Sequence, residues 1–410
     1  MNASESLSAG LKALPNKTSS FASTQAAWRF YSNDSVSLSK LQEPLTAAAH
    51  EGIAEHCDKY ALCVKDWSRL HYKHSNKSDA YVITHKHDVG YDLQTSLVLS
   101  DRTGRPIAPV AQRLVCSQGS YSTYADKELT ETVKSHLDEA IDCIEFLEKQ
   151  GFEKPLVHII DREADSVFHL RGLEKLGSLW LVRVKDDPAL EFKGVSMKAK
   201  AIAQELTFSK SRQVIYHGKK YWQWVAQADV TLARDAKPSQ KKGKKPAISS
   251  DPVSAKLVVS RVLDENGEVL AQGLLLTNVK EVDDSTIALW YYWRWQIECF
   301  FKLLKSAGHQ LESWQQESAL AIAKRLLVAS MACVMVWEIV ADQSNEVAEL
   351  RRFLIKLSGR QMRHKQEFSN PALLDGLWVF LSMLEIMNAY SADELESFKL
   401  TAQKFIDKLV

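Results

Sequence analysis

The spacing of apolar and polar residues changes repeatedly between strand-like and helical patterns over the first half of the chain. Short apolar or alternating runs are typical of strands, whereas apolar residues at every third or fourth position are typical of helices. The segments with a strand pattern are 59–70, 78–86, 91–109, in which the strand ends at the turn DRTGR (101–105), 155–165 and 178–187, and the predicted helices are 126–150 and 166–177. Three strands followed by helix, strand, helix and strand predict an α/β layer arrangement.

The second half of the chain divides into a strand-patterned region and a helical one. The strand-like patterns occupy residues 212–234, 255–269 and 271–279. A loop at 237–252 is rich in Lys, Pro, Gly and Ser. Residues 306–410 have a helical pattern throughout. Their most apolar run, 326–337, is only about twelve residues long, which is too short to span a bilayer, so it predicts a buried helix.

The composition is that of an ordinary folded protein, with 45% hydrophobic and 25% charged residues among 410. The 52 basic and 51 acidic residues nearly cancel, so the net charge favours no class of partner. The six cysteines form no CxxC pair and no zinc-like spacing with histidine, which fits a reducing cytosol. The N-terminal residues lack the basic and apolar segments of an export signal. We therefore expect a cytoplasmic protein that does not enter a membrane.

Residues 291–305, YYWRWQIECFFKLLK, predict one amphipathic helix. Its apolar face carries Trp293, Ile297, Phe300 and Leu304. The opposite face carries Tyr291, Arg294, Glu298, Lys302 and Lys305 within roughly 80° of arc. A stripe of this kind is either a solvated surface with i,i+4 ion pairs or a functional face. The partners available to Glu298 decide between these interpretations.

Two aspartates follow apolar runs in predicted strands, Asp66 in CVKDWS and Asp161 in HIIDREAD. Adjacent strands can place such residues side by side, and a helix packed on the sheet can bring Glu298 to them. Mg²⁺ and Mn²⁺ prefer oxygen ligands, and three carboxylates can hold two such ions about 4 Å apart. Two ions in this arrangement activate the attacking oxygen and stabilise the leaving oxygen of a phosphodiester. The sequence thus predicts metal-dependent phosphoryl transfer on nucleic acid.

Two spaced motifs give the chain a family resemblance. It resembles the cut-and-paste transposases of bacterial insertion sequences, whose catalytic domain carries an Asp, Asp, Glu triad. Their marker is Tyr, two residues, Arg, three residues, Glu, six residues and Lys, which matches Tyr291, Arg294, Glu298 and Lys305. Their second motif, Asp-Arg-Glu-Ala-Asp, is intact at 161–165. The similarity extends from roughly residue 20 to residue 310.

The resemblance implies an α/β fold, namely a ribonuclease H-like mixed sheet with flanking helices, interrupted by a β-rich insertion and extended by N- and C-terminal helical regions. The implied regions are an N-terminal helical DNA-binding arm (1–55), the catalytic domain (56–185 and 281–312), the β-rich insertion (186–280) and a C-terminal helical region that pairs protomers (313–410). The family's N-terminal DNA-binding region is usually longer than this arm. Recognition of the terminal repeats is then weakened or moved elsewhere, or the chain is a shortened relative.

The resemblance also implies the roles of individual residues. Asp66, Asp161 and Glu298 are the implied catalytic residues and hold two Mg²⁺ ions, for which Mn²⁺ substitutes. The implied DNA contacts are Tyr291, Arg294, Lys302 and Lys305, which hold phosphates and terminal nucleotides at the cleaved end. Arg162 and Asp165 orient the strand end rather than bind metal. A tryptophan that stacks on a flipped base in the family is replaced here by Gly273, and Trp222, Trp224 and Trp290 are alternatives.

Further basic residues are compatible with either DNA contact or a solvated surface. Arg183 and Lys185 alternate along a predicted strand and therefore share one face. The loop lysines that we predict to contact DNA are Lys241, Lys242, Lys244 and Lys245.

The predicted function is that of a DNA transposase. Its partners are double-stranded DNA, as terminal inverted repeats and as target, and a second copy of itself in the synaptic complex. We expect it in the nucleoid of the bacterial cytoplasm. By resemblance, cleavage is followed by formation and resolution of a hairpin and by strand transfer of the 3′-hydroxyl. Two alternatives are a shortened, non-catalytic regulator that binds DNA and a metal-dependent nuclease on the same fold.

Overall fold

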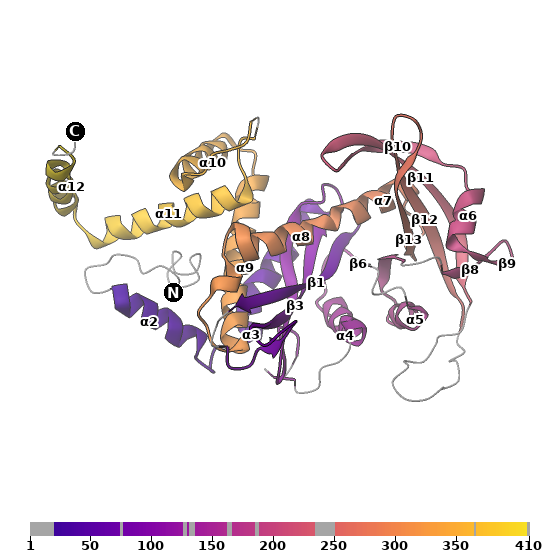
Figure 1. Ribbon diagram of the computed structural model, residues 1–410, viewed down its shortest axis with the longest axis horizontal. Helices are drawn as coiled ribbons and strands as arrows, with labels where there is room; N and C mark the ends of the chain where they lie inside the picture. Colours follow the sequence, from indigo (N-terminus) through magenta and orange to yellow (C-terminus); the bar gives the residue numbers. More distant parts are fainter. Residues whose placement is uncertain are drawn as a thin grey trace.

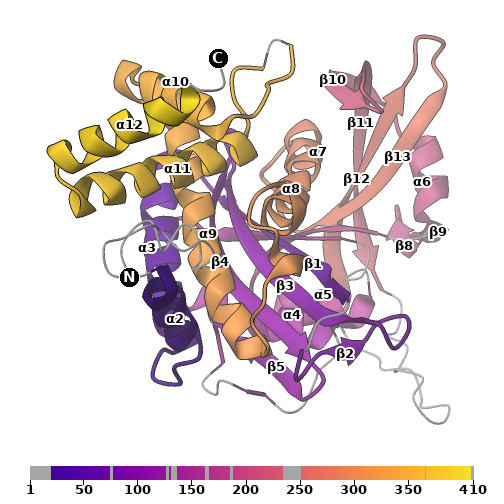
Figure 2. The same ribbon diagram turned by 60° about the vertical axis from the view of Figure 1, so that its left-hand side comes forward.

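The computed structural model describes residues 20–73, 77–125, 129–130, 136–161, 166–184, 188–233, 251–364 and 366–407. One long sheet runs through these residues, with the C-terminal helices near one end and a β-rich region at the other (Figures 1 and 2). The strand order along it is β5-β4-β3-β1-β6-β7-β13-β12-β11-β8-β9, while β2 pairs with β3 and β10 pairs with β11.

The first half of the sheet has the predicted mixed topology. Its strands are β1 (Ala61–Lys73), β2 (Tyr81–Val82), β3 (Asp88–Ser100), β4 (Pro106–Cys116), β5 (Gly119–Ser122), β6 (Leu156–Ile160) and β7 (Leu179–Arg183). β1 pairs antiparallel with β3 and parallel with β6, and β6 pairs parallel with β7. All five residues of β6 are buried, as expected for a parallel strand covered on both faces. The predicted ribonuclease H-like mixed sheet is confirmed.

The second half of the sheet contains the predicted β-rich insertion. It consists of β8 (Ala189–Phe192), β9 (Val195–Lys198), α6 (Ala199–Glu205), β10 (Ser209–Tyr216), β11 (Lys219–Leu232), β12 (Val253–Leu263) and β13 (Val269–Thr277). β13 pairs with β7, with Leu275 opposite Arg183, so the insertion continues the first half of the sheet edge to edge. The domain boundaries given above stay a prediction.

Helices cover both faces of the first half of the sheet (Figure 1). α4 (His136–Glu148) and α5 (Val167–Lys175) pack on one face, and α3 (Leu38–His56), α8 (Trp295–Lys302) and α9 (Ala319–Ala341) on the other. The remaining helices are α2 (Ser20–Tyr31), α7 (Asp284–Trp293), α10 (Asn345–Ser358), α11 (Asn370–Ala389) and α12 (Ala392–Ile406). Because α3 is buried against β4 and α9, residues 38–56 belong to the body of the molecule rather than to a free arm.

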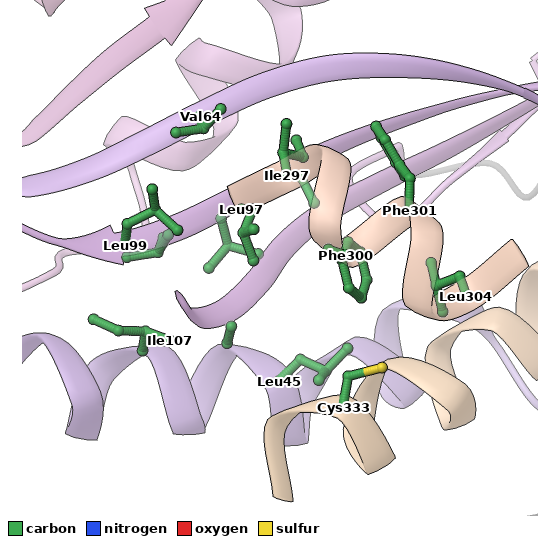
Figure 3. Close-up of a cluster of buried hydrophobic side chains, with 14 of the residues drawn as sticks. Leu45, Val64, Leu97, Leu99, Ile107, Ile297, Phe300, Phe301, Leu304 and Cys333 are labelled. Atoms are coloured by element: carbon green, nitrogen blue, oxygen red, sulfur yellow. The ribbon is translucent and has the colours of Figure 1, made fainter. Parts of the chain in front are cut away.

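The face of the sheet under α8 is held by a continuous apolar core (Figure 3). Ile297, Phe300 and Leu304 are at most 1% exposed, as the sequence predicted for this side of the helix. Ile297 lies closest to Val64 and Leu97 of the sheet, and all three belong to the same apolar cluster as those two residues. Burial of each such side chain contributes about 1.5–3 kcal/mol, so α8 is fixed firmly on β1.

The buried helix predicted around 326–337 is confirmed but longer than expected. α9 spans 23 residues, because its small residues at both ends extend the apolar pattern. It is long and apolar enough to cross a membrane, yet 83% of its most apolar window is buried inside the protein. α11 passes the same test of length and composition with 33% of its window buried.

Two strand predictions were wrong in detail. The strand predicted at 78–86 is reduced to Tyr81–Val82, because Asp79 turns inward and accepts hydrogen bonds from Tyr91 Oη and the Ala319 N–H. β4 was not predicted as a separate strand, and it contains Pro106 and Pro109. The pairing register with β3 shifts near both prolines, and such irregularities let a sheet accept residues that lack an N–H.

Three buried histidines predict a pH-dependent loss of stability. Burial lowers the pKa of His158, His169 and His309 to about 4 each. The unfolded chain takes up a proton near pH 6.5 and the folded chain only near pH 4, so stability is lost as the pH falls through this interval. We expect the free energy of unfolding to drop by roughly 2 kcal/mol per histidine between pH 7.5 and 5, measured by urea denaturation.

The variant His169→Leu provides a control for this pH effect, since neither ring nitrogen of His169 has a hydrogen-bond partner among the described residues. Its drop between the two pH values should be smaller by roughly 2 kcal/mol. An identical drop in variant and wild type would contradict the assignment.

Candidate active site

Asp66 and Asp161 come together at neighbouring parallel strands. Lys65 of β1 lies opposite Ile160, the last residue of β6. The residue that follows each of them is an aspartate, Asp66 after Lys65 and Asp161 after Ile160. Side chains alternate along a strand, and Lys65 contacts α4 through Cys143 Sγ at 3.2 Å. Asp66 therefore projects from the opposite face, the one that α8 covers. This juxtaposition follows from the strand pattern alone.

Glu298 reaches the same place from a helix whose turns are irregular. The helix predicted at 291–305 is observed with a change of winding at two points: α7 ends at Trp293, α8 starts at Trp295, and a π-helical turn follows at Leu303–Ala307, while Arg294 and Leu303 keep helical backbone angles. At Arg294 the winding tightens: the Arg294 N–H donates to Tyr291 O, and the Arg294 carbonyl accepts from the Ile297 N–H, both at 3.1 Å. Tyr291, Arg294 and Glu298 of the predicted polar stripe stay together.

The guanidinium of Arg294 joins all three acids. It lies 2.7 Å from Asp66 Oδ2, 2.9 Å from Glu298 Oε1 and 3.5 Å from Asp161 Oδ2. Tyr291 Oη donates to Asp161 Oδ1 at 2.9 Å, and the Trp67 N–H donates to Asp66 Oδ1 at 2.9 Å. Three carboxylates from β1, β6 and α8 thus converge on one cation.

The electrostatics of this cluster reflect crowding of like charges in a half-buried place. Burial raises the pKa of Asp66 and of Glu298, Arg294 lowers both, and the neighbouring carboxylates raise them further. Burial and the charge of Asp161 raise the pKa of Tyr291 to about 12. Burial opposes the charge on Arg294, but its interactions with Tyr291 and Asp66 outweigh burial and raise its pKa. Arg294 is therefore the counter-charge that makes three ionised acids tolerable here.

The donor set suits a hard divalent cation, because all three side chains offer carboxylate oxygens. Among the residues that the structure describes, no three acids, histidines or cysteines form a ready metal cage, since Arg294 lies between the carboxylates. The acids fit a metal only if Arg294 gives way. Asp165 of the second motif, like Arg162, lies outside the described residues.

The other predicted contact residues are spread over separate places. Lys305 lies beside β1 three residues beyond Asp66, where its Nζ donates to Arg69 O at 2.6 Å. Lys302 is exposed and lines a different cavity of about 410 Å³, beside Cys299 and Phe368. Lys185, Lys241, Lys242, Lys244 and Lys245 lie outside the described residues.

A larger cavity of about 760 Å³ opens next to the carboxylates. Its lining includes Arg183, Tyr216, Gly273, Tyr291, Arg294 and Trp295. A Cβ built on Gly273 would meet nothing within 4 Å, so this glycine leaves space. Sequence reasoning missed Trp295, which is 62% exposed, because its neighbours suggested an apolar helix face.

The tryptophans proposed from the sequence as substitutes are not in the lining of this cavity. Trp290 is buried, and the ring of Trp222 is covered by the ammonium of Lys210 at 3.7 Å. Exposed aromatic surface beside the carboxylates instead comes from Tyr292 and Trp295.

Comparison with known proteins adds three findings. A family model described as "Transposase DDE domain" matches residues 63–335, which include all three acids and more than half of the chain. No curated protein matches significantly. A solved structure, the piggyBac transposase synaptic complex with hairpin DNA determined by cryo-EM, matches with 9% sequence identity and a TM-score of 0.39. The match covers 84% of this chain and 57% of that one, so the chain spans little more than half the length of that transposase.

Proposed function

The chain belongs to the transposase DDE domain family, and from that premise we propose that it cuts DNA at transposon ends and joins the freed 3′-hydroxyls to target DNA. One observation carries the proposal: Asp66, Asp161 and Glu298, far apart in sequence, all lie within 3.5 Å of one guanidinium. Ordinary surface ion pairs rarely gather three acids from a sheet and a helix. The bland interpretation of the polar stripe, a solvated face, does not account for this convergence.

In this proposal Arg294 would turn toward DNA, and the three carboxylates would then hold two divalent ions, Mg²⁺ or Mn²⁺. When bound, such ions neutralise negative charge on the reacting phosphate and activate the attacking water or hydroxyl oxygen. Arg294 then pairs with a backbone phosphate, for which its planar fork is well suited. Tyr291, whose pKa of about 12 keeps it protonated, remains a hydrogen-bond donor to Asp161 or to the terminal nucleotide.

The DNA end occupies the cavity of about 760 Å³ beside the carboxylates. Arg183 offers a positive charge on one wall, and Trp295 and Tyr292 offer exposed rings on which an unpaired base stacks. Stacking of this kind holds a base outside the duplex. Hairpin formation and resolution, which the family resemblance suggests, require such a holding site, and here the rings come from α7 and α8 instead of position 273.

Two protomers act together in the proposed reaction, because both transposon ends must be held for joining. The C-terminal helices support this part of the proposal. Their exposed apolar side chains are Met383, Leu384, Met387, Phe398, Leu400 and Phe405. Figure 1 shows α11 and α12 reaching away from the sheet, where a second copy has access. Action on the bacterial nucleoid follows from the same function.

Two other functions compete with this proposal. A metal-dependent nuclease needs the same carboxylates but no strand transfer. A shortened regulator binds DNA without cutting it, and it has no need to keep three acids around one cation. The retained acids favour an enzyme over a regulator.

One reaction separates the three functions. Purified protein is incubated with Mn²⁺, pre-cut transposon ends and a supercoiled plasmid, and the products are resolved on gels. The expected result is DNA in which the transposon ends are joined to the plasmid. The complexes that form these products should have the mass of two protein chains bound to DNA. Nicked plasmid without joining would indicate a nuclease, and a mobility shift without cutting would indicate a regulator.

A further inference from the structure

The floor of the cavity of about 760 Å³ is one face of strands β11, β12 and β13. Ser260 of β12 lies opposite Gly273 of β13. Gln223 of β11 lies opposite Val262, two residues further along β12. Residues two positions apart on a strand share a face, and so do residues opposite one another, so these four belong to one face. All four line the cavity, which therefore has two polar side chains in its floor, next to a position without a side chain.

The amide of Gln223 is only half satisfied, although the residue is 5% exposed. Its Nε2 donates to Ser260 Oγ at 2.8 Å. Its Oε1 has no hydrogen-bond partner within the described part of the chain. A buried carbonyl oxygen of this kind has lost its hydrogen bonds to water without gaining others, which is unfavourable. Gln223 therefore brings to the cavity floor an acceptor that gains from a ligand N–H.

Ser260 adds a donor beside this acceptor. Its Oγ accepts from Gln223 Nε2, which leaves the hydroxyl hydrogen for a second partner. Gly273, directly opposite, keeps the way to this hydroxyl open, because a Cβ built on it would meet nothing within 4 Å. Any larger side chain at this position would lie against Ser260, as opposite residues on one face do. One acceptor and one donor thus lie side by side behind an open space.

We infer that Gln223 and Ser260 bind the polar edge of an unpaired nucleobase that enters the cavity over Gly273. The inference rests on the proposed function, because it names the ligand group that the same cavity takes. The pairing edge of a nucleobase offers an N–H group next to an acceptor atom, which matches the acceptor of Gln223 and the donor of Ser260. Inside a duplex both groups are occupied by the partner base. The pair therefore selects unpaired bases over paired ones.

The remaining parts of the cavity fit the rest of a nucleotide. Tyr292 and Trp295, which are 47% and 62% exposed, offer rings on which the base stacks. Arg183 of β7 offers the positive charge that a backbone phosphate requires. β7 adjoins β6, the strand that leads to Asp161. The phosphate of a bound nucleotide is thereby placed on the side of the carboxylates, and its base on the side of Gln223 and the insertion.

Stacking and hydrogen bonding make different predictions for a base with a modified edge. Difluorotoluene has nearly the shape of thymine, but it lacks the ring N–H and the carbonyl oxygens of thymine. A site that only stacks a base binds the two alike. A site with buried polar groups rejects the analogue, because these groups are then left without partners.

The test measures binding of the full chain, without metal ions, to three DNA duplexes that differ in one unpaired nucleotide. This nucleotide is thymidine, its difluorotoluene analogue or an abasic residue, and fluorescence anisotropy gives the dissociation constants. We expect the wild type to bind the thymidine duplex about tenfold more tightly than the difluorotoluene duplex, and the abasic duplex most weakly. Gln223→Leu should bind the first two duplexes equally. Ser260→Ala should reduce the preference to about threefold, and it remains informative if Gln223→Leu folds poorly.

Two further variants test the position of the base. Gln227→Leu makes the same change on the same strand, but Gln227 is exposed and does not line the cavity, so the tenfold preference should be retained. Gly273→Leu fills the open space and should weaken binding of the thymidine duplex to the level of the abasic one. A thermal melt of each variant shows that its fold is intact.

The inference is overturned if the wild type binds the thymidine and difluorotoluene duplexes equally, or binds none of the three. It is also overturned if Gln223→Leu keeps the preference, in which case water is the partner of Gln223 Oε1. These measurements need neither metal nor cleavage. Failure of the wild type to cut or join DNA would count against the proposed function alone, while a preference that depends on Gln223 would still support the base-binding site.

Discussion

The variant Glu298→Gln is expected to lose DNA strand cleavage by about 10³-fold or more while binding transposon-end DNA nearly as well as the wild type. Glutamine has the size and the helix preference of glutamate, and Glu298 is 33% exposed at its side chain, so the fold should be retained. The amide removes one negative charge from a site that must collect divalent cations. It also leaves DNA contacts by Arg183 and the aromatic rings intact.

The measurement pairs a cleavage assay in Mn²⁺ with a filter-binding titration on the same end DNA. Glu367→Gln serves as the control, since Glu367 is exposed and lies outside the carboxylate cluster. If Glu298→Gln still cleaves DNA, Glu298 is not a catalytic residue. Loss of both binding and cleavage would point to misfolding, which a thermal melt distinguishes.

The meeting of Asp66 and Asp161 could be predicted from the sequence because it depends on local rules. Each aspartate follows a short apolar run, and the helix between them, α4, allows β1 and β6 to be parallel neighbours. The prediction that Asp66 ends its strand was wrong, because β1 continues to Lys73, and it is the pairing of Lys65 with Ile160 that sets Asp66 beside Asp161. The apolar side of α8 was predictable for a similar reason, since Ile297, Phe300 and Leu304 keep helical spacing.

The tightened helical turn at Arg294 could not be predicted in the same way. The stretch around it contains neither glycine nor proline, the residues that usually mark an irregular turn. The tightened turn accompanies a tertiary contact, because Arg294 pairs with Asp66, which lies 228 residues earlier in the chain.

The cavity lining was also beyond sequence reasoning. The search for a base-stacking residue relied on tryptophans near the insertion, but the exposed ring next to the carboxylates is Trp295 at the start of α8. Exposure of an aromatic residue depends on what packs over it, and nothing in a single sequence reports that. Gly273 reaches this cavity because β13 pairs with β7, which is a long-range contact in the sequence.

Replacement of Arg294 by methionine should make the metal-free protein less stable and more responsive to divalent cations. Arg294 is 11% exposed and pairs with carboxylates that are 21–33% exposed, so its loss leaves like charges facing one another. Removing one partner of a buried pair costs about 3–5 kcal/mol, and partial exposure here reduces this to roughly 2 kcal/mol. Thermal unfolding with and without Mn²⁺ measures both effects.

The pH dependence gives this prediction its sign. The pKa of Asp66 and that of Glu298 are already raised by burial, and loss of Arg294 raises them further. A raised folded-state pKa stabilises the protein below the unfolded-state pKa, and this stability is lost as the pH rises through the folded-state value. The destabilisation of Arg294→Met should therefore be small near pH 4 and large near pH 8.

Mn²⁺ should bind the DNA-free Arg294→Met variant about tenfold more tightly than the wild type, because the competing cation is gone. Arg294→Lys keeps a positive charge without the planar fork, so its stability and its metal affinity should lie between the two. Equal stabilisation of all three proteins by Mn²⁺ would contradict the idea that Arg294 and the metal ions share the same carboxylates. Tighter binding in the methionine variant, together with weaker binding of end DNA, would identify Arg294 as the group that couples arrival of DNA to loading of metal.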